Sequence, residues 1–371
     1  MKQVYIIDYI RTPIAKFQGG LSEVRADDLA AIVLKEIVKR NPQIPAEEIE
    51  DVILGCANQA GEDNRNVARM ASLLAELPIK IGGETVNRLC ASGMAAIANA
   101  YRAIAIGEGE IYLAGGVEQM TRAPYVLSKS AQPFGRDVQL FDSSFGWRFV
   151  NPKMKELYGV DGMGETAENL AEIYKISREA QDEFALHSQQ KATSAQNSGR
   201  LAQEIVNVEI PQKKGEPKIF SQDEFVKPDT TLDKLAKLRP AFKKEGGSVT
   251  AGNSSGLNDG AAAMILASED AVKKYNLKPL AKIISSAVVG VEPRIMGIGP
   301  VEATKKALSR ANLSLEDMDI IELNEAFAAQ ALSVLQELGI DAKDERLNPN
   351  GGAIALGHPL GMSGTRIVGT A

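Results

Sequence analysis

The chain has 371 residues, 44% of them hydrophobic, and a formal net charge of −6 at pH 7. This length and composition predict a globular protein of two or three domains, and a charge spread without acidic or basic runs argues against nucleic acid or a membrane surface as a partner. The two cysteines exclude a disulfide framework and favour a reducing, cytoplasmic location. The sequence has no uninterrupted apolar stretch of the kind that would predict a membrane span or a signal peptide.

Short apolar runs alternate with amphipathic helical patterns in the first third of the chain. Strands are expected at 4–9, 51–56 and 110–120, and helices at 29–40, 66–77 and after residue 90. This alternation is typical of an α/β fold.

Cys90 stands where an apolar strand meets an alanine-rich helix. A thiolate is the nucleophilic form of cysteine, and a position in the first helical turn lowers the pKa of a thiol. An arbitrary cysteine is more often an inert core residue, but the small residues Ala91, Ser92 and Gly93 allow a ligand to approach this sulfur. We therefore predict Cys90 as a nucleophile and Cys56, at a strand end, as a core residue.

The middle of the chain, residues 118–249, is more polar. It contains helical patterns at 167–176 and 178–196, and we interpret it as an inserted domain that faces mostly solvent. His187 lies in the second of these helices between polar neighbours, which favours a surface position over a catalytic one.

A similar order of elements begins again near residue 281. Strands are expected at 281–290 and 319–324, and helices at 301–313, 325–339 and from 360 onward. The halves look like copies, although alternation alone also fits any doubly wound sheet.

This repeat predicts three units. The first half is residues 1–117, completed by 250–275, the insertion is 118–249, and the second half is 276–371. By comparison with the first half, one more strand is expected after Ala371, because a sheet that lacks a central strand leaves backbone groups unpaired.

His358 and Asn324 are the other candidates for chemistry. Five glycines surround His358 in NPNGGAIALGHPLGMSG, and Pro359 restricts its backbone to an extended conformation, so the loop presents the ring rigidly. A cysteine with a histidine is the pattern of an activated nucleophile in acyl transfer. Asn324, between an expected strand and helix, is either an N-cap or the holder of a water that donates to an oxyanion.

Three blocks together resemble the thiolase family: VNRLCASG, NEAFA and GGAIALGHPLGMSG. The similarity extends along the chain through AGGVEQMTRAPY and LRPAFKKEGGSVTAGNSSGLNDGAAA. It implies a duplicated, five-layered α/β/α/β/α core with an inserted loop domain, and the activity of an acetyl-CoA acyltransferase. The partners implied are acyl-CoA and CoA, with CoA a substrate, no separate cofactor and no metal, in a homodimer or homotetramer.

The resemblance also implies roles for individual residues. Cys90 takes the acyl group, His358 activates it, and Asn324 positions a water that stabilises the enolate oxygen together with His358. The backbone amide of Cys90 is expected to contribute to a second oxyanion hole. The CoA contacts carried over from the family motifs are Met163, Lys227, Phe242, Ser255 and Phe327.

The family also implies a second catalytic cysteine in a C-x-G-G-G-x-G segment, which these 371 residues do not contain. We therefore expect the chain of 371 residues to turn over poorly. An acyl-CoA-binding protein without turnover is an alternative for this form.

Within the family, residues 55–70 and 145–169 look like the 3-oxoadipyl-CoA thiolases of aromatic-acid degradation. Gly162 occupies a position where the biosynthetic acetoacetyl-CoA type commonly has histidine. A 3-oxoadipyl group ends in a carboxylate that needs a cation or several donors, and Arg148, between Trp147 and Phe149, is the candidate. A structural or interface arginine is the alternative for Arg148.

Two other activities fit less well. A general acetyl-CoA acetyltransferase is the second choice within the family. A decarboxylating ketoacyl synthase shares the fold and the cysteine but needs a second active-site histidine, and His187 lies outside any suitable motif.

Overall fold

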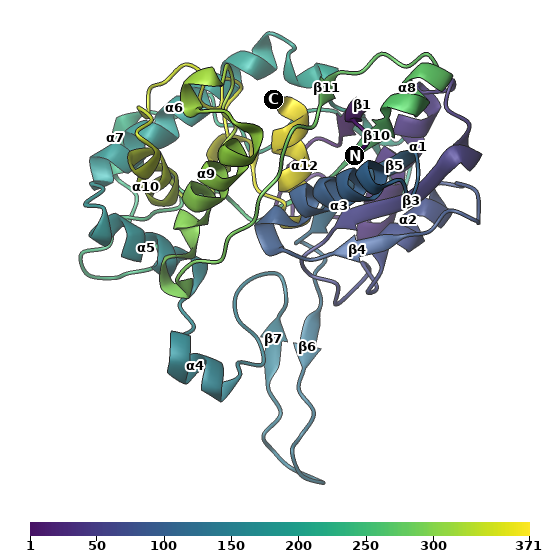
Figure 1. Cartoon of the computed structure of the whole chain (residues 1–371). Coiled ribbons are helices and arrows are strands. Elements are labelled where there is room, and N and C mark those ends of the chain that lie inside the picture. The colour runs from purple at the N-terminus through teal and green to yellow at the C-terminus, as the bar shows by residue number, and fades with distance from the viewer.

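The computed structural model describes all 371 residues, and its largest element is a sheet covered by helices on both faces (Figure 1). The seven strands are β1 (Val4–Arg11), β2 (Ala15–Lys16), β3 (Ile49–Gly55), β4 (Glu84–Val86), β5 (Ile111–Gln119), β10 (Asn258–Ser268) and β11 (Ala281–Lys282). Their order is β11-β1-β10-β5-β3-β4, with β2 paired to β10. Strands β3, β4 and β5 are parallel, whereas β10 is antiparallel to both its neighbours. The predicted α/β class is confirmed.

Two helices cover each face of this sheet. The helices α1 (Ala26–Arg40) and α2 (Val67–Leu74) lie on one face, and α3 (Ser92–Ile106) and α12 (Leu360–Thr370) lie on the other. Every residue of β5 and β10 is buried, as expected for central strands with an apolar layer on each side. The C-terminal helix α12 therefore packs on the sheet of the first half, next to α3.

One segment, Leu89–Ile106, is long and apolar enough by composition to cross a membrane, although no such span was predicted. Half of it is buried inside the protein, because it comprises α3 and the turn before it, which pack against the sheet and alongside α12. That is the position of a core helix.

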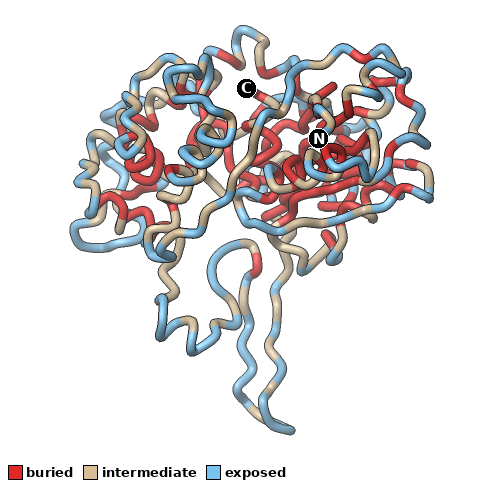
Figure 2. The backbone as a smooth tube through the Cα atoms, in the orientation of Figure 1, coloured by how far each residue is buried: buried red, intermediate tan, exposed pale blue.

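The middle of the chain forms a hairpin and a set of helices. The hairpin of β6 (Tyr125–Leu127) and β7 (Leu140–Asp142) projects away from the body, with α4 beside it, and is mostly exposed (Figures 1 and 2). The remaining elements of this part are α4 (Pro152–Tyr158), α5 (Met163–Ile173), α6 (Arg178–Asn197), β8 (Val208–Ile210), β9 (Lys218–Phe220) and α7 (Leu232–Ala236). His187 is half-buried on α6.

The two strands predicted between the helices of the second half are mostly irregular segments. Helix α8 (Glu269–Lys274) precedes this half, and the helices of the second half are α9 (Gly299–Ala311), α10 (Ala328–Leu338) and α11 (Ala353–Leu356), followed by α12. The strand predicted over 281–290 is confined to β11, and the strand predicted over 319–324 is reduced to one bridge between Ile321 and Leu347.

The segment after residue 279 forms only a short strand because its backbone hydrogen bonds go to β1. The amide of Leu280 donates to the carbonyl of Ile6, and the amide of Ile283 donates to that of Val4. These bonds attach the segment to β1, so it extends the first sheet and has no ladder of its own beyond that point. The division into three units is not decided by these contacts and stays a prediction.

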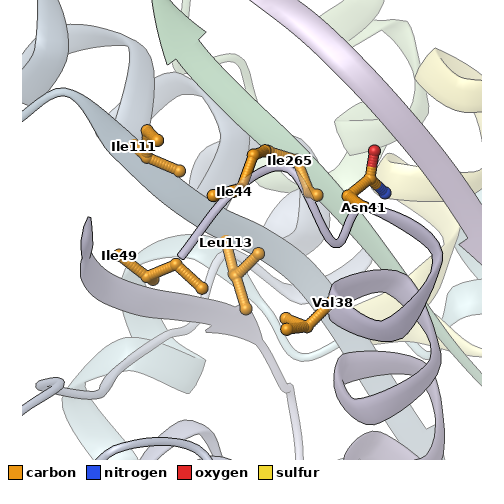
Figure 3. Close-up of a pocket in the computed structure, with 7 residues that line it drawn as sticks. All are labelled: Val38, Asn41, Ile44, Ile49, Ile111, Leu113 and Ile265. Atoms are coloured by element: carbon orange, nitrogen blue, oxygen red, sulfur yellow. The ribbon is translucent and has the colours of Figure 1, made fainter. Parts of the chain in front are cut away.

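The core also contains a small apolar void between the C-terminal end of α1 and strands β3, β5 and β10 (Figure 3). It is lined by Val38, Asn41, Ile44, Ile49, Ile111, Leu113 and Ile265. The void leaves no room for a water molecule, so it is a packing feature and not a ligand site.

Candidate active site

Cys90 lies in a strained turn. It is the middle residue of a 3₁₀ turn, Leu89–Ala91, that leads into α3. Leu89 has φ +47°, a left-handed conformation that is uncommon for leucine. Its amide donates to Oδ1 of Asn87 at 2.9 Å, and its carbonyl accepts from the Ser92 hydroxyl at 2.7 Å. Strain held by specific bonds in this way is typical of functional sites.

The sulfur of Cys90 is a neutral thiol at neutral pH. Burial raises the pKa of Cys90 to about 11, its own backbone amide opposes this rise, and the charge of Glu118 adds to it. The predicted lowering of this pKa was wrong. Desolvation outweighs the field of the helix, because α3 begins only at Ser92, beyond the sulfur. A nucleophilic role for Cys90 therefore requires a base.

His358 is buried in the loop between α11 and α12. Its Nδ1 lies 2.6 Å from the hydroxyl of Ser363, and that hydroxyl donates to the carbonyl of Pro359 at 2.8 Å. Because the only proton of Ser363 is used in this way, Nδ1 must carry the ring proton and donate it to Ser363. The other nitrogen, Nε2, is then unprotonated, and its lone pair accepts from Nδ2 of Asn324 at 3.3 Å.

The environment also keeps this ring neutral. Burial and then the positive charge of Arg366 lower the pKa of His358 to about 4. The backbone amide of His358 donates to Oδ1 of Asn258 at 2.9 Å, which fixes the loop to β10. The ring is thus an oriented, unprotonated base at neutral pH.

Close packing brings the His358 loop to the Cys90 turn. The 3₁₀ turn of Cys90 packs against α12, which begins two residues after His358. A Cβ atom on Gly93 would lie 2.6 Å from Oγ1 of Thr365 and 2.7 Å from the carbonyl oxygen of Gly361. Only glycine permits this approach of α3 to α12. The structure thereby places the predicted cysteine and histidine on two segments in direct contact.

Asn324 is not a helix cap, because α10 begins at Ala328, with Phe327 at its N-cap. The amide nitrogen of Asn324 is used by His358, whereas its buried Oδ1 has no hydrogen-bond partner. An unpaired buried oxygen needs a donor such as water. Of the two predicted roles, this geometry favours the holder of a water.

Four of the predicted CoA contacts gather beside this site. The ring of Phe242 packs over Gly164, next to Met163 at the start of α5, and meets the ring of Phe327 edge to face, with centroids 5.9 Å apart. The hydroxyl of Ser255 donates to the carbonyl of Ala326 at 3.0 Å, one residue before Phe327. The arrangement forms a half-exposed apolar wall with a hydroxyl at its edge.

Lys227 lies apart from this wall. It lines a cavity of about 310 Å³ together with Lys234 and Thr230, and its ammonium group is 4.8 Å from the centroid of Phe225. Lys234 pairs with Asp229, which also lines the cavity, so Lys227 is the cation there that a phosphate-bearing ligand would meet.

Arg148 is half-buried between β7 and α4, and its guanidinium donates to the carbonyl of Ser143 at 3.3 Å. The two aromatic neighbours of Arg148 have other partners. The indole of Trp147 donates to the carbonyl of Asp161, and Phe149 packs edge to face on Phe141.

Sequence reasoning missed two residues of the site, Ser363 and Glu118. Ser363 selects the tautomer of His358, and its only sequence signal is a position in the first turn of the helix after Pro359. Glu118 is a buried carboxylate at the end of the otherwise apolar β5, and burial raises its pKa to about 7. A carboxylate in a fully buried strand is a signal that could have been read.

Two family models cover nearly the whole chain. The model described as "Thiolase, N-terminal domain" matches residues 4–270, and that described as "Thiolase, C-terminal domain" matches residues 277–371.

Similar proteins include several with one name. The chain is 58% identical over its full length, and over 92% of the relative, to a beta-ketoadipyl-CoA thiolase of Acinetobacter baylyi. It is 60% identical to the beta-ketoadipyl-CoA thiolase of Pseudomonas knackmussii, over 100% of this chain and 92% of that one. It is 59% identical to the 3-oxoadipyl-CoA/3-oxo-5,6-dehydrosuberyl-CoA thiolase of Escherichia coli, over 99% of this chain and 91% of that one.

Solved structures agree with the fold. An acetyl-CoA acetyltransferase of Bacillus anthracis superposes with a TM-score of 0.92 at 43% identity, over 100% of this chain and 91% of that one. Human mitochondrial 3-ketoacyl-CoA thiolase in complex with CoA superposes with a TM-score of 0.90 at 42% identity, over 100% of this chain and 90% of that one.

Proposed function

Because the chain belongs to the thiolase family, we propose that it cleaves a 3-oxoacyl-CoA with CoA through an acyl group on Cys90, or runs the reverse condensation. The observation that supports this most directly is the state of His358. Its ring is neutral, its Nε2 is unprotonated and accepts from Asn324, and it is carried by a loop held against the Cys90 turn. A neutral thiol and a neutral, oriented imidazole on two contacting segments fit the resting state of a cysteine that is activated by proton transfer.

In the cleavage direction, Nε2 of His358 takes the proton of the thiol as the sulfur adds to the 3-oxo carbon. The bond between carbons 2 and 3 then breaks, which leaves the acyl group on Cys90 and an enolate on the CoA fragment. Asn324, through a water on its unpaired Oδ1, and the protonated His358 stabilise the enolate oxygen. The proton on His358 passes to carbon 2 and gives acetyl-CoA, which leaves Nε2 able to take the proton of a second CoA thiol. That thiolate displaces the acyl group from Cys90, and the Cys90 sulfur regains the proton from His358.

CoA binding is supported by the human relative that carries CoA in its structure. The wall of Met163, Phe242, Ser255 and Phe327 would contact the pantetheine arm. Lys227, in the neighbouring cavity, would meet the phosphates of the nucleotide end.

We propose 3-oxoadipyl-CoA as the substrate, with succinyl-CoA and acetyl-CoA as the products. The support is the shared name of relatives at 57–60% identity, compared with 43% for the acetyl-CoA acetyltransferase. The distal carboxylate of this substrate needs a donor, and Arg148 is half-buried with a single hydrogen bond to a carbonyl, which leaves donors free.

Intact-mass analysis after incubation with acetyl-CoA tests the acyl-cysteine. We expect one acetyl adduct that Cys90→Ala abolishes and that the matched control Cys56→Ala retains, because Cys56 is fully buried. His358→Ala should slow formation of the adduct by about 10²–10⁴, the range for loss of a general base. An adduct that survives in Cys90→Ala would contradict the proposal.

A second measurement tests the substrate. Arg148→Met keeps much of the apolar stem of the side chain and removes its charge. The value of kcat/KM for 3-oxoadipyl-CoA should fall by roughly 30- to 1,000-fold, as expected for a lost charge-assisted pair, while that for acetoacetyl-CoA changes little. Equal losses on both substrates would mean that Arg148 is structural.

A further inference from the structure

Glu118 is a buried carboxylate that binds the start of α12 directly and is linked to the Cys90 turn through a chain of hydrogen bonds. It lies at the end of β5 with 2% of its surface exposed, and its oxygens accept only from backbone amides. Glu118 has no cation as a partner, so the charge depends on these amides alone. Burial of a carboxylate without an ion pair is costly, which indicates a role beyond packing.

The first contact leads to the histidine. Oε2 of Glu118 accepts from the amide of Gly361 at 2.8 Å, in the first turn of α12. A Cβ atom on Gly361 would lie 2.3 Å from the carbonyl oxygen of Val117, so the start of α12 is pressed against the end of β5. Because α12 begins just after His358 and carries Ser363, the position of its first turn also sets the position of the imidazole.

The second contact leads to the cysteine. Oε1 of Glu118 accepts from the amide of Asn58 at 3.1 Å, and the carbonyl of the same peptide unit, that of Ala57, accepts from Nδ2 of Asn87 at 2.9 Å. Oδ1 of Asn87 in turn accepts from the amide of Leu89, the strained residue before Cys90. One carboxylate is therefore connected to the Cys90 turn through a single peptide plane and one side chain.

We propose that Glu118 is a positioning residue for the acylation of Cys90: its carboxylate holds α12, with His358, and the Cys90 turn in fixed relation through Gly361 and the Ala57–Asn58 peptide. This role rests on the proposed acyl-cysteine chemistry. The same carboxylate is a negative charge close to the sulfur, so it also disfavours the thiolate until His358 accepts the proton.

The titratable groups around Glu118 are few. The charge of Glu118 acts on Cys56 and Cys90, and the charge of Asp63 acts on Glu118. The loop before α12 contributes His358, and α12 contributes Arg366, which pairs with Glu322. No other acid acts on the Cys90 sulfur. Replacement of Glu118 by its neutral isostere therefore has a defined electrostatic effect on Cys90.

Glu118→Gln separates positioning from general stability, because it should move two rates in opposite directions. At pH 8, removal of the charge favours the thiolate, so alkylation of Cys90 by iodoacetamide should become about two- to fivefold faster. Acylation of Cys90 by acetyl-CoA should become about 10²-fold slower, the size of effect produced by misplaced reacting groups. A purely structural carboxylate would not accelerate alkylation.

Asp259→Asn is the matched control. Asp259 is also buried, on the neighbouring β10, and is held by the amide and hydroxyl of Thr121. Its removal should lower stability without acceleration of Cys90 alkylation. Unchanged or slower alkylation in Glu118→Gln, or acylation at the wild-type rate, would overturn the proposal.

Asn87→Ala breaks the hydrogen-bond chain from Glu118 to the Cys90 turn and leaves Glu118 itself unchanged. Because Asn87 is exposed, folding should be preserved. Acylation should fall by about tenfold or more with little change in KM for CoA. Asn99→Ala, on α3, is its control. Wild-type acylation in Asn87→Ala would contradict the link. If wild-type protein forms no acyl adduct while Glu118→Gln still accelerates alkylation, the acyl-cysteine proposal fails and the charge effect of Glu118 stands.

Discussion

The candidate chemistry depends at the residue scale on which nitrogen of His358 carries the proton. Ser363 uses its own proton on the carbonyl of Pro359, so it can only accept from Nδ1. This arrangement leaves Nε2 as the base and explains why a buried, neutral imidazole is retained beside a thiol. The tautomer of His358 is therefore set by Ser363, which the first turn of α12 holds in place.

Ser363→Ala should therefore slow acylation of Cys90 by about 10²-fold, because the ring loses the bond that selects its tautomer and orientation. The measurement is the single-turnover rate of adduct formation by mass spectrometry. Ser333→Ala is the control, since the Ser333 hydroxyl also donates to a carbonyl one helical turn earlier, that of Ala329, away from the site. Equal rates in the two variants would remove Ser363 from the mechanism.

The lowered pKa of His358 predicts a pH dependence of stability. The pKa is about 4 in the folded protein, against an ordinary value of 6.5, so the unfolded chain binds this proton more readily. The contribution of His358 is complete above pH 6.5 and is lost as the pH falls through 4, by at most about 3 kcal/mol. Glu118, whose pKa is raised to about 7, acts in the opposite direction between its ordinary value of 4.5 and 7.

The difference between wild type and His358→Asn isolates the histidine from these carboxyl groups. Urea unfolding from pH 4 to 8 should show wild type losing stability relative to the variant as the pH falls below 6.5. A difference that does not vary with pH would contradict the buried, neutral state of the ring.

At the scale of secondary-structure elements, the contact between α3 and α12 sets the relative positions of the Cys90 turn and the His358 loop. Glycines line it from both sides, because a side chain at Gly93 or Gly364 would collide with the backbone of the other helix. The result is that the turn before α3 and the loop before α12 are held together. The geometry of Cys90 and His358 thus follows from a helix contact between distant parts of the chain.

Gly364→Ala tests this contact. Alanine favours a helix over glycine by about 1 kcal/mol, but its Cβ would lie 2.3 Å from the backbone nitrogen of Met94. We expect a net loss of about 1–3 kcal/mol from overpacking, together with slower acylation of Cys90. Gly299→Ala in α9, where the nearest atom would be 3.8 Å away, is the control and should be neutral or slightly stabilising. A stabilised Gly364→Ala would show that the helices do not need this approach.

Across the whole molecule, a buried charge network joins the first strand to the middle of the chain. Arg11 on β1 is fully buried, and its guanidinium binds both carboxylate oxygens of Asp223 at 2.7 and 2.8 Å and one of Glu204 at 2.6 Å. Glu204 also accepts from Thr370 at the end of α12. Three distant segments therefore meet at one guanidinium, beside the sheet.

Arg11→Met should destabilise the protein by about 3–5 kcal/mol, because it leaves Asp223 buried without a cation and leaves Glu204 with Arg200 alone. Denaturant unfolding measures the loss. The control is Lys343→Met, which removes an exposed pair with Glu183 and should cost less than about 1 kcal/mol. Similar losses in the two variants would show that the network contributes no more than a surface pair.

The local sequence determined the strands and helices of the first half and the identity of the candidate nucleophile and base. The predicted helix at 29–40 lies within α1, and the predicted strand at 51–56 overlaps β3. Both predictions rest on an apolar period of 3.6 or 2, which is a property of neighbouring residues. Cys90, His358 and Asn324 also stood out locally, because small or rigid neighbours expose a reactive group.

Only the tertiary structure decided their states and partners. Desolvation raises the pKa of Cys90, where the local helix signal predicted a decrease, and Ser363 and Glu118 act through contacts with segments elsewhere in the fold. The strand predicted over 281–290 ended after two residues for the same reason, since a strand needs a partner across the sheet, and its partner is β1. Burial and pairing are properties of the folded chain, and no window of sequence contains them.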